Sequence, residues 1–204
     1  MYKPIELNYE YNGLEPYISG ETIFLHYEKH YKGYLDRLNK VLEKNNFDFK
    51  DDVAYVIKNI DKFPIEDRDT ILFNAGGVIN HELYFENMNK KGSHIPFGDL
   101  KQAIDNQYGN YDNFKTEFKN KASKLVGSGY TFLVLDNYKK LNIINMSNQE
   151  SPYSYDMIPL MALDLWEHAY YLDYQNLKNA YINNFFEIVS FDKVNEKYKE
   201  TIKK

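Results

Sequence analysis

The sequence predicts an α+β protein, with an N-terminal antiparallel helical hairpin followed by a C-terminal α/β domain that contains a small three-stranded antiparallel sheet. Two stretches of the first half, 21–45 and 66–88, place apolar residues at helical spacing. Residues 130–135 are instead rich in β-branched and aromatic side chains, which is typical of a strand. Helical spacing then returns near the C-terminal end, so the strands lie between helices.

The first half contains the two helices of the predicted hairpin. In the helix expected at 21–45, Gly33 marks a bend or a point of close packing. A short helix is expected at 53–60. The second long helix, 66–88, contains the small residues 75–77, where another backbone could approach closely. Two long helices joined by a loop form an antiparallel pair.

The second half begins after a polar run, 89–98, that is rich in turn residues. This run is the best candidate boundary, so we expect domains at 1–90 and 91–204. The elements expected beyond it are helices at 99–108 and 111–126, strands at 130–135, 140–146 and 159–163, and a final helical stretch from 175 that carries Leu177, Tyr181, Phe185 and Ile188.

Composition excludes several classes of protein and site. The 204 residues are 43% hydrophobic and 27% charged, which is the composition of a globular protein able to bury a core. No apolar run approaches the ~20 residues of a membrane-spanning helix. The chain has no cysteine, which removes disulfides and thiolate ligands, so any metal must be held by imidazole and carboxylate.

The net charge of −5, without a basic stripe, makes nucleic acid or an anionic membrane a poor candidate partner. A secretory signal has a positively charged start, an apolar stretch and a cleavage site, and the first residues show no such pattern. A cytoplasmic location is therefore the default expectation.

The 5 histidines can be considered one by one. His26 and His30 are four residues apart on the first helix and share a face, and the hairpin brings His81 of the second helix alongside. Asp164 and His168 form another pair at the same spacing, directly after an apolar strand. One carboxylate with several imidazoles suits Mn, Fe, Zn or Ni, and the residues alone do not choose between them.

Plainer interpretations exist for each of these residues. A histidine pair on an amphipathic helix is more often no metal site, Asp164 could cap a helix, and His168 could be a buried, hydrogen-bonded imidazole. His94, in the polar run, is most simply a solvated residue. Zinc-protease, di-iron, phosphate-loop and nucleophile-elbow motifs are absent.

Residues 164–172, Asp-Leu-Trp-Glu-His-Ala-Tyr-Tyr-Leu, closely resemble a signature of the iron/manganese superoxide dismutases. Three further blocks resemble the family in order and spacing: Leu-Glu-Pro-Tyr-Ile-Ser at 14–19 followed by His-Tyr-Glu-Lys-His at 26–30 and Tyr34, Asn-Ala-Gly-Gly-Val-Ile-Asn-His at 74–81, and Asn-Gln-Glu at 148–150. The resemblance covers nearly the whole chain. It implies an enzyme that oxidises one superoxide to dioxygen and reduces the next to hydrogen peroxide.

The resemblance also implies roles for individual residues. The metal ligands would be His26, His81, Asp164 and His168, two from each domain, with water or hydroxide as the fifth ligand. His30 and Tyr34 would be gateway residues on the substrate path and would relay protons, and Gln149 would hydrogen-bond the metal-bound solvent.

A symmetric homodimer, or a tetramer built from it, is implied as well. Glu167 would reach His168 of the partner subunit, and Tyr171 would reach His30 of the partner subunit. Self-complementary contacts of this kind are what a two-fold axis requires.

The metal is expected to be manganese, one ion per chain, with iron or dual use as the alternative. Iron-type members usually carry the solvent-binding glutamine on the second helix, where this chain has Gly77, and manganese-type members carry it at the position of Gln149. Val78 stands where many manganese enzymes have histidine. The aromatic shell also departs from the usual tryptophan-rich pattern, with Tyr84-Phe85, Tyr130 and Phe132.

The negative net charge repels superoxide, so a local positive region is needed for fast encounter. Lys29 and Lys178 are the candidates, and each could equally be an ordinary surface lysine. Two other hypotheses remain at this point: a metal-binding or storage protein without turnover, and a structural α+β module with buried histidines. Tyr34, His30 and Gln149 favour the enzyme, because storage needs no proton relay.

Overall fold

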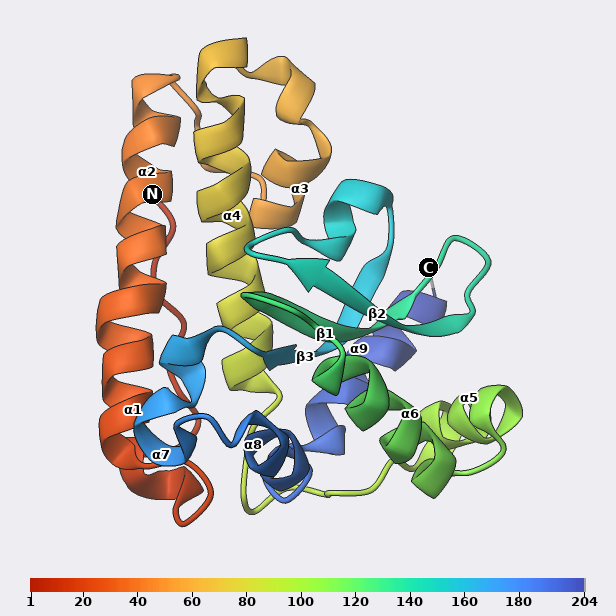
Figure 1. Cartoon of the computed structure of the whole chain (residues 1–204). Helices are drawn as coiled ribbons and strands as arrows, with labels where there is room; N and C mark the ends of the chain where they lie inside the picture. Colours follow the sequence, from red (N-terminus) through yellow and green to blue (C-terminus); the bar gives the residue numbers. More distant parts are fainter. Residues whose placement is uncertain (204) are drawn as a thin grey trace.

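The computed structural model describes residues 1–203 and has the α+β architecture predicted (Figure 1). The long helices of the N-terminal half form one side of the molecule, and the three-stranded sheet with most helices of the C-terminal half lies on the other. Within the described residues, no helix is long and apolar enough to cross a membrane. Short 3-10 segments lie at Tyr11–Leu14, Ile60–Lys62, Pro152–Tyr155 and Glu167–Ala169.

The first predicted helix is divided into three parts. It begins as α1 (Gly20–Leu25), whose N-cap Ser19 accepts a hydrogen bond from the Thr22 amide, and continues through a π-helical segment, His26–Tyr31, into α2 (Lys32–Lys44). This irregular turn precedes Gly33, which itself lies in regular α-helix.

The partner in the hairpin is α4 (Ile65–Glu86), which runs antiparallel to α2 and packs against it along its length (Figure 1). The short helix α3 (Val53–Lys58) lies between them in sequence and packs against α4. In α2, the leucines and other apolar residues at helical spacing, Leu35, Leu38, Val41 and Leu42, are buried. This apolar stripe is what holds the hairpin together.

The sheet contains β1 (Gly129–Leu135), β2 (Leu141–Ser147) and β3 (Ile158–Asp164) in the order β2-β1-β3, and all pairings are antiparallel. Every residue of the central strand β1 is buried, because elements pack on the sheet from both sides. The helix α6 contacts β1 and β2, while α4 contacts β3. The register places Tyr130 of β1 opposite Asp164, the last residue of β3.

The remaining helices are α5 (Gly98–Tyr108), α6 (Tyr111–Ser123), α7 (Tyr171–Tyr174), α8 (Lys178–Phe185) and α9 (Phe191–Ile202). The prediction of one final helix from 175 that includes Ile188 is wrong. Between α8 and α9 the chain pairs with the end of α4: Val189 forms a β-bridge with Met88, and the Asn89 amide donates to the Ile188 carbonyl at 2.8 Å. Those backbone bonds end the helix, and Ile188 is buried outside it.

Candidate metal centre

Four side chains from distant parts of the sequence meet where β3 ends beside the helical hairpin. They are His26 from the π-helical segment, His81 from α4, Asp164 from the end of β3 and His168 from the 3-10 turn that follows. One ligand atom of each lies within 4.8 Å of the others. The side chains of His26, His81 and Asp164 are fully buried, and that of His168 is 12% exposed.

The distances between these atoms match the spacing of ligands around one metal ion. Asp164 Oδ2 lies 3.1 Å from His26 Nε2, and 3.6 Å from both His81 Nε2 and His168 Nε2. The Nε2 atoms of His81 and His168 are 3.4 Å apart. An ion at ordinary metal–nitrogen and metal–oxygen distances of about 2.1 Å keeps neighbouring ligand atoms roughly 3 to 3.6 Å apart. The four side chains therefore fit a metal ion.

Local structure turns each donor atom inward. His81 Nδ1 lies 2.5 Å from the carbonyl oxygen of Gly77, so this nitrogen donates its proton and leaves the lone pair on Nε2. Asp164 Oδ1 accepts a hydrogen bond from the Trp166 amide at 2.8 Å, which leaves Oδ2 for the centre. The π-helical segment carries His26, and such segments are frequent at functional sites.

Burial sets the charge of the site. It lowers the pKa of His26 to about 4 and that of His81 well below the ordinary value, so both rings are neutral near pH 7. Burial alone would raise the pKa of Asp164, but its hydrogen bonds with His168 and His26 outweigh this effect and lower it. Neutral imidazole and ionised carboxylate are the forms in which these groups bind metals.

Three of the other predicted residues adjoin this cluster. His30 stacks on His168 with ring centres 4.0 Å apart, and burial together with the charges of His168 and His26 lowers its pKa to about 4. The Tyr34 ring lies 5.3 Å from that of His81. Gln149, which is 2% exposed, donates from Nε2 to the Tyr34 hydroxyl at 3.2 Å. Its Oε1 has no hydrogen-bond partner within residues 1–203.

The predicted close approach of another backbone at the small residues of α4 is confirmed at Gly76, where an added Cβ would lie 1.8 Å from the carbonyl oxygen of Gln149. A Cβ added to Gly77 would lie 2.4 Å from Cδ1 of Tyr34, so only glycine leaves room for this ring.

The remaining predicted residues do not join the cluster within one chain. Glu167 is exposed, as is Tyr171, at 49%. Lys29 is exposed too, whereas Lys178 donates from Nζ to the carbonyl of Leu125 at 2.7 Å.

The expectation that His94 is simply a solvated residue is wrong. Its Nδ1 lies 2.8 Å from the Val189 carbonyl oxygen and its Nε2 lies 3.1 Å from that of Lys90. The ring thus links two segments that are far apart in the sequence: the chain after α4, to which His94 and Lys90 belong, and the segment between α8 and α9, which contains Val189.

Two residues near the cluster were not assigned a role from the sequence. Tyr130, fully buried, places its hydroxyl 3.3 Å from His81 Nδ1. Arg37 lies over the Tyr34 ring, with Cζ 4.8 Å from the ring centre. Two features of the sequence could have pointed to these residues. Tyr130 lies in the strand that pairs with Asp164, and Arg37 lies one helical turn after Tyr34.

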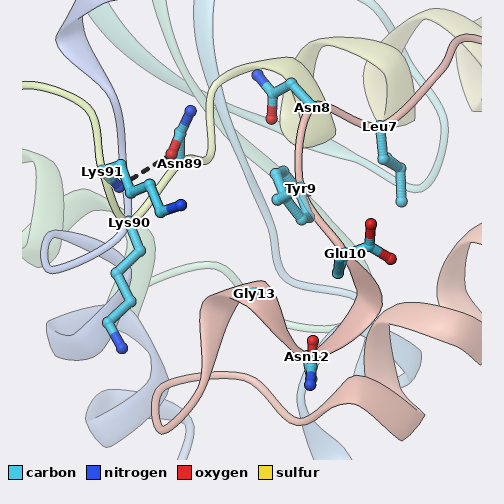
Figure 2. A pocket seen from close by; sticks show the side chains of 9 residues that line it. All are labelled: Leu7, Asn8, Tyr9, Glu10, Asn12, Gly13, Asn89, Lys90 and Lys91. Carbon is cyan, nitrogen blue, oxygen red and sulfur yellow. Dashed lines mark hydrogen bonds between the residues drawn. The ribbon is translucent and has the colours of Figure 1, made fainter.

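A cavity of about 560 Å³ lies elsewhere, between the N-terminal segment and the chain after α4 (Figure 2). Its lining is mostly polar and includes none of the four cluster residues: Leu7, Asn8, Tyr9, Glu10, Asn12, Gly13, Asn89, Lys90 and Lys91. The histidine–aspartate cluster therefore lies outside this cavity.

Comparison with known proteins identifies the family. Residues 1–89 match the family model described as iron/manganese superoxide dismutases, alpha-hairpin domain, and residues 96–197 match the corresponding C-terminal domain. The chain belongs to the iron/manganese superoxide dismutase family. It is therefore an oxidoreductase that dismutates superoxide to dioxygen and hydrogen peroxide, and the predicted family and enzyme class are confirmed.

Two curated relatives are similar over nearly their full length. A protein of Listeria innocua serovar 6a named superoxide dismutase [Mn] is 37% identical over 197 residues, which cover 97% of each chain. A protein of Bacillus anthracis named superoxide dismutase [Mn] 2 is 36% identical over 97% of this chain and 94% of its own.

Proposed function

We propose that this superoxide dismutase works with one manganese ion per chain, bound by His26, His81, Asp164 and His168. The observation that carries the proposal is the convergence of three imidazole nitrogens and one carboxylate oxygen within 4.8 Å in a buried site. Two ligands come from a unit at 1–90 and two from a unit at 91–204. A bound manganese or iron ion supplies a centre that takes an electron from one superoxide and gives an electron to the next.

The surrounding residues supply protons and orientation. Reduction of superoxide to hydrogen peroxide consumes two protons, which must reach a largely buried site. The Tyr34 hydroxyl is hydrogen-bonded to Gln149 and can donate its own proton onward. His30 stacks on His168 at the half-buried edge of the site and is the second proton carrier.

Manganese is proposed instead of iron because of where the glutamine beside Tyr34 comes from in the chain. Gln149 approaches Tyr34 from the sheet side, and Gly77 on α4 offers no side chain in its place. The two relatives described above are named as manganese enzymes. Hydrogen bonds around a metal tune its potential, so the place of the amide matters for which metal is active.

A homodimer is proposed as the working assembly. Glu167 and Tyr171 flank residues 168–170 in sequence, and both are exposed in the single chain. Pairing of two copies about a two-fold axis would place Glu167 beside His168 of the partner subunit and Tyr171 beside His30 of the partner subunit. Sedimentation of the wild type and of Glu167→Ala tests this, with a monomeric wild type as the contradicting result. A cytoplasmic location stays a prediction.

The test of the proposed function is metal reconstitution. The metal-free protein is reloaded separately with manganese and with iron, and metal per chain and superoxide dismutation are measured in each. Activity with manganese alone is the expected result. Equal activity with both metals would contradict the manganese assignment, and stoichiometric binding without activity from either would leave a metal-binding protein.

The ligand set has its own test. His81→Ala removes one donor from a buried site, so we expect loss of metal and of activity while the chain stays folded. Circular dichroism and metal analysis of the variant check this. Full metal occupancy in His81→Ala would show that the proposed ligand set is wrong.

A further inference from the structure

Arg37 is held at a fixed place beside Tyr34. Its guanidinium carbon lies 4.8 Å from the centre of the Tyr34 ring, and its Nε donates to Asn74 Oδ1 at 2.9 Å. The Asn74 amide is buried and donates from Nδ2 to the Thr70 carbonyl at 2.7 Å, so its oxygen is directed toward Arg37. The guanidinium therefore bridges α2 and α4 over one of the two proposed gateway residues.

The choice of residue at this position is informative. Of the 25 Lys and Arg residues, only Arg37 and Arg68 are arginine. Arginine keeps its charge at all relevant pH values and stacks on an aromatic face, whereas a lysine ammonium is a strongly hydrated point charge on a flexible stem. A lysine at 37 would not be held over Tyr34 in the same way.

The other cations considered for guiding superoxide are less well placed. Lys29 is exposed and makes no hydrogen bond or ion pair from its side chain within residues 1–203. The Lys178 ammonium is bound to the Leu125 carbonyl oxygen. Arg37 instead adjoins the ring that itself lies 5.3 Å from His81.

We propose that Arg37 is the residue that attracts small anions to the entrance beside Tyr34 and so raises the rate at which superoxide reaches the site. This inference rests on the proposed function, because it takes the entrance to lie beside Tyr34 and His30. The net charge of −5 opposes the approach of an anion, and a fixed positive charge at the entrance offsets that repulsion locally.

The expected effect is modest and depends on salt. One charge acting over about 10 Å changes an encounter rate roughly two- to five-fold at low ionic strength. The Debye length falls from about 30 Å at 0.01 M salt to about 8 Å at 0.15 M, so the effect is expected to disappear at high salt.

The test compares Arg37→Gln, Arg37→Lys and Lys140→Gln with the wild type, each loaded with metal. Lys140→Gln is the matched control, because it removes the same charge from the exposed β1–β2 turn, away from α2 (Figure 1). Two quantities are measured against ionic strength: kcat/KM for superoxide, and the affinity for azide, a small anion followed by its absorption change on binding. Thermal unfolding of each variant checks that the fold is kept.

We expect Arg37→Gln to lower both quantities roughly two- to five-fold at low salt, with convergence on the wild type at about 0.5 M salt. Arg37→Lys should recover most of the salt dependence, and Lys140→Gln should change neither quantity. A loss in Arg37→Gln that is equal at all salt concentrations would overturn the inference, because it would indicate a purely structural role. An inactive wild type would instead overturn the proposed function, and azide binding would still test Arg37.

Discussion

Gly76 of α4 lies directly against the backbone of Gln149: a Cβ added to Gly76 would lie 1.8 Å from the carbonyl oxygen of Gln149. A second contact holds the same segment, since Asn80 Nδ2 donates to the Glu150 carbonyl at 3.0 Å. Because glycine has no Cβ, residue 76 lets the segment after β2 approach α4 this closely. The position of the Gln149 amide beside Tyr34 follows from it.

Replacing this glycine should therefore displace Gln149. We expect Gly76→Ala to lower the free energy of unfolding by about 1–3 kcal/mol, because the added methyl group meets backbone and not a flexible side chain. Thermal unfolding and metal per chain measure the effect. The control is Gly33→Ala, where the new Cβ meets only the tip of Arg37 at 3.2 Å and helix propensity rises. Equal stability of Gly76→Ala and wild type would contradict the close contact.

The hydrogen bond between Gln149 and Tyr34 predicts that the two side chains act as a unit. Gln149→Leu and Tyr34→Phe should each lower kcat about 10- to 100-fold, the usual cost of losing a partner around a metal. The double variant should be little worse than the more damaging single variant, because neighbours that share one interaction are not additive. Metal per chain is measured alongside. Fully additive losses would show that the two residues work separately.

Much of the fold could be predicted because its signals are local. The α2 and α4 stripes follow the helical period, and the strands of the sheet are rich in β-formers with turns between them. The convergence of Asp164 and His168 with the hairpin histidines followed from the resemblance of 164–172 to a known family. The residues alone left plainer interpretations open.

The features that could not be predicted from the sequence depend on contacts between distant segments. The helix after Gln175 ends because the segment around Ile188 pairs with the end of α4, and nothing in the local apolar spacing signals that pairing. The π-helical segment, His26–Tyr31, keeps an ordinary helical sequence. Nothing local in the sequence indicates where the Arg37 side chain lies, since its position depends on Asn74 of another helix.

Tyr130 places a hydroxyl where this family usually has an indole, 3.3 Å from His81 Nδ1. We expect Tyr130→Phe to weaken metal binding by about ten-fold, the lower end of the usual range, because the Gly77 carbonyl still holds the ring. Competition with a chelator measures this for manganese and for iron. Tyr198→Phe, another buried tyrosine, is the control. Unchanged affinity for both metals would show that the hydroxyl only fills space.

Glu82 predicts the pH dependence of stability. Burial, assisted by the charge of Glu86 and opposed by a hydrogen bond from Tyr31, raises its pKa from 4.5 to about 7. Between these values the folded state binds more protons than the unfolded state, so stability falls as pH rises from about 4.5 to 7. One pKa unit corresponds to about 1.4 kcal/mol. Because Glu82 is only partly buried, we expect a loss of about 1–2 kcal/mol.

Glu82→Gln should remove this loss while its amide oxygen still accepts the hydrogen bond from Tyr31. The variant should therefore match the wild type near pH 4.5 and exceed it by about 1–2 kcal/mol near pH 8, which is roughly 3–6 °C in Tm for a chain of this size. The comparison uses metal-free protein, because protonation of the histidines releases metal and would add its own pH dependence. Glu43→Gln, on the exposed face of α2, is the control. Parallel stability curves for Glu82→Gln and wild type would show that Glu82 is ionised in the folded protein across this range.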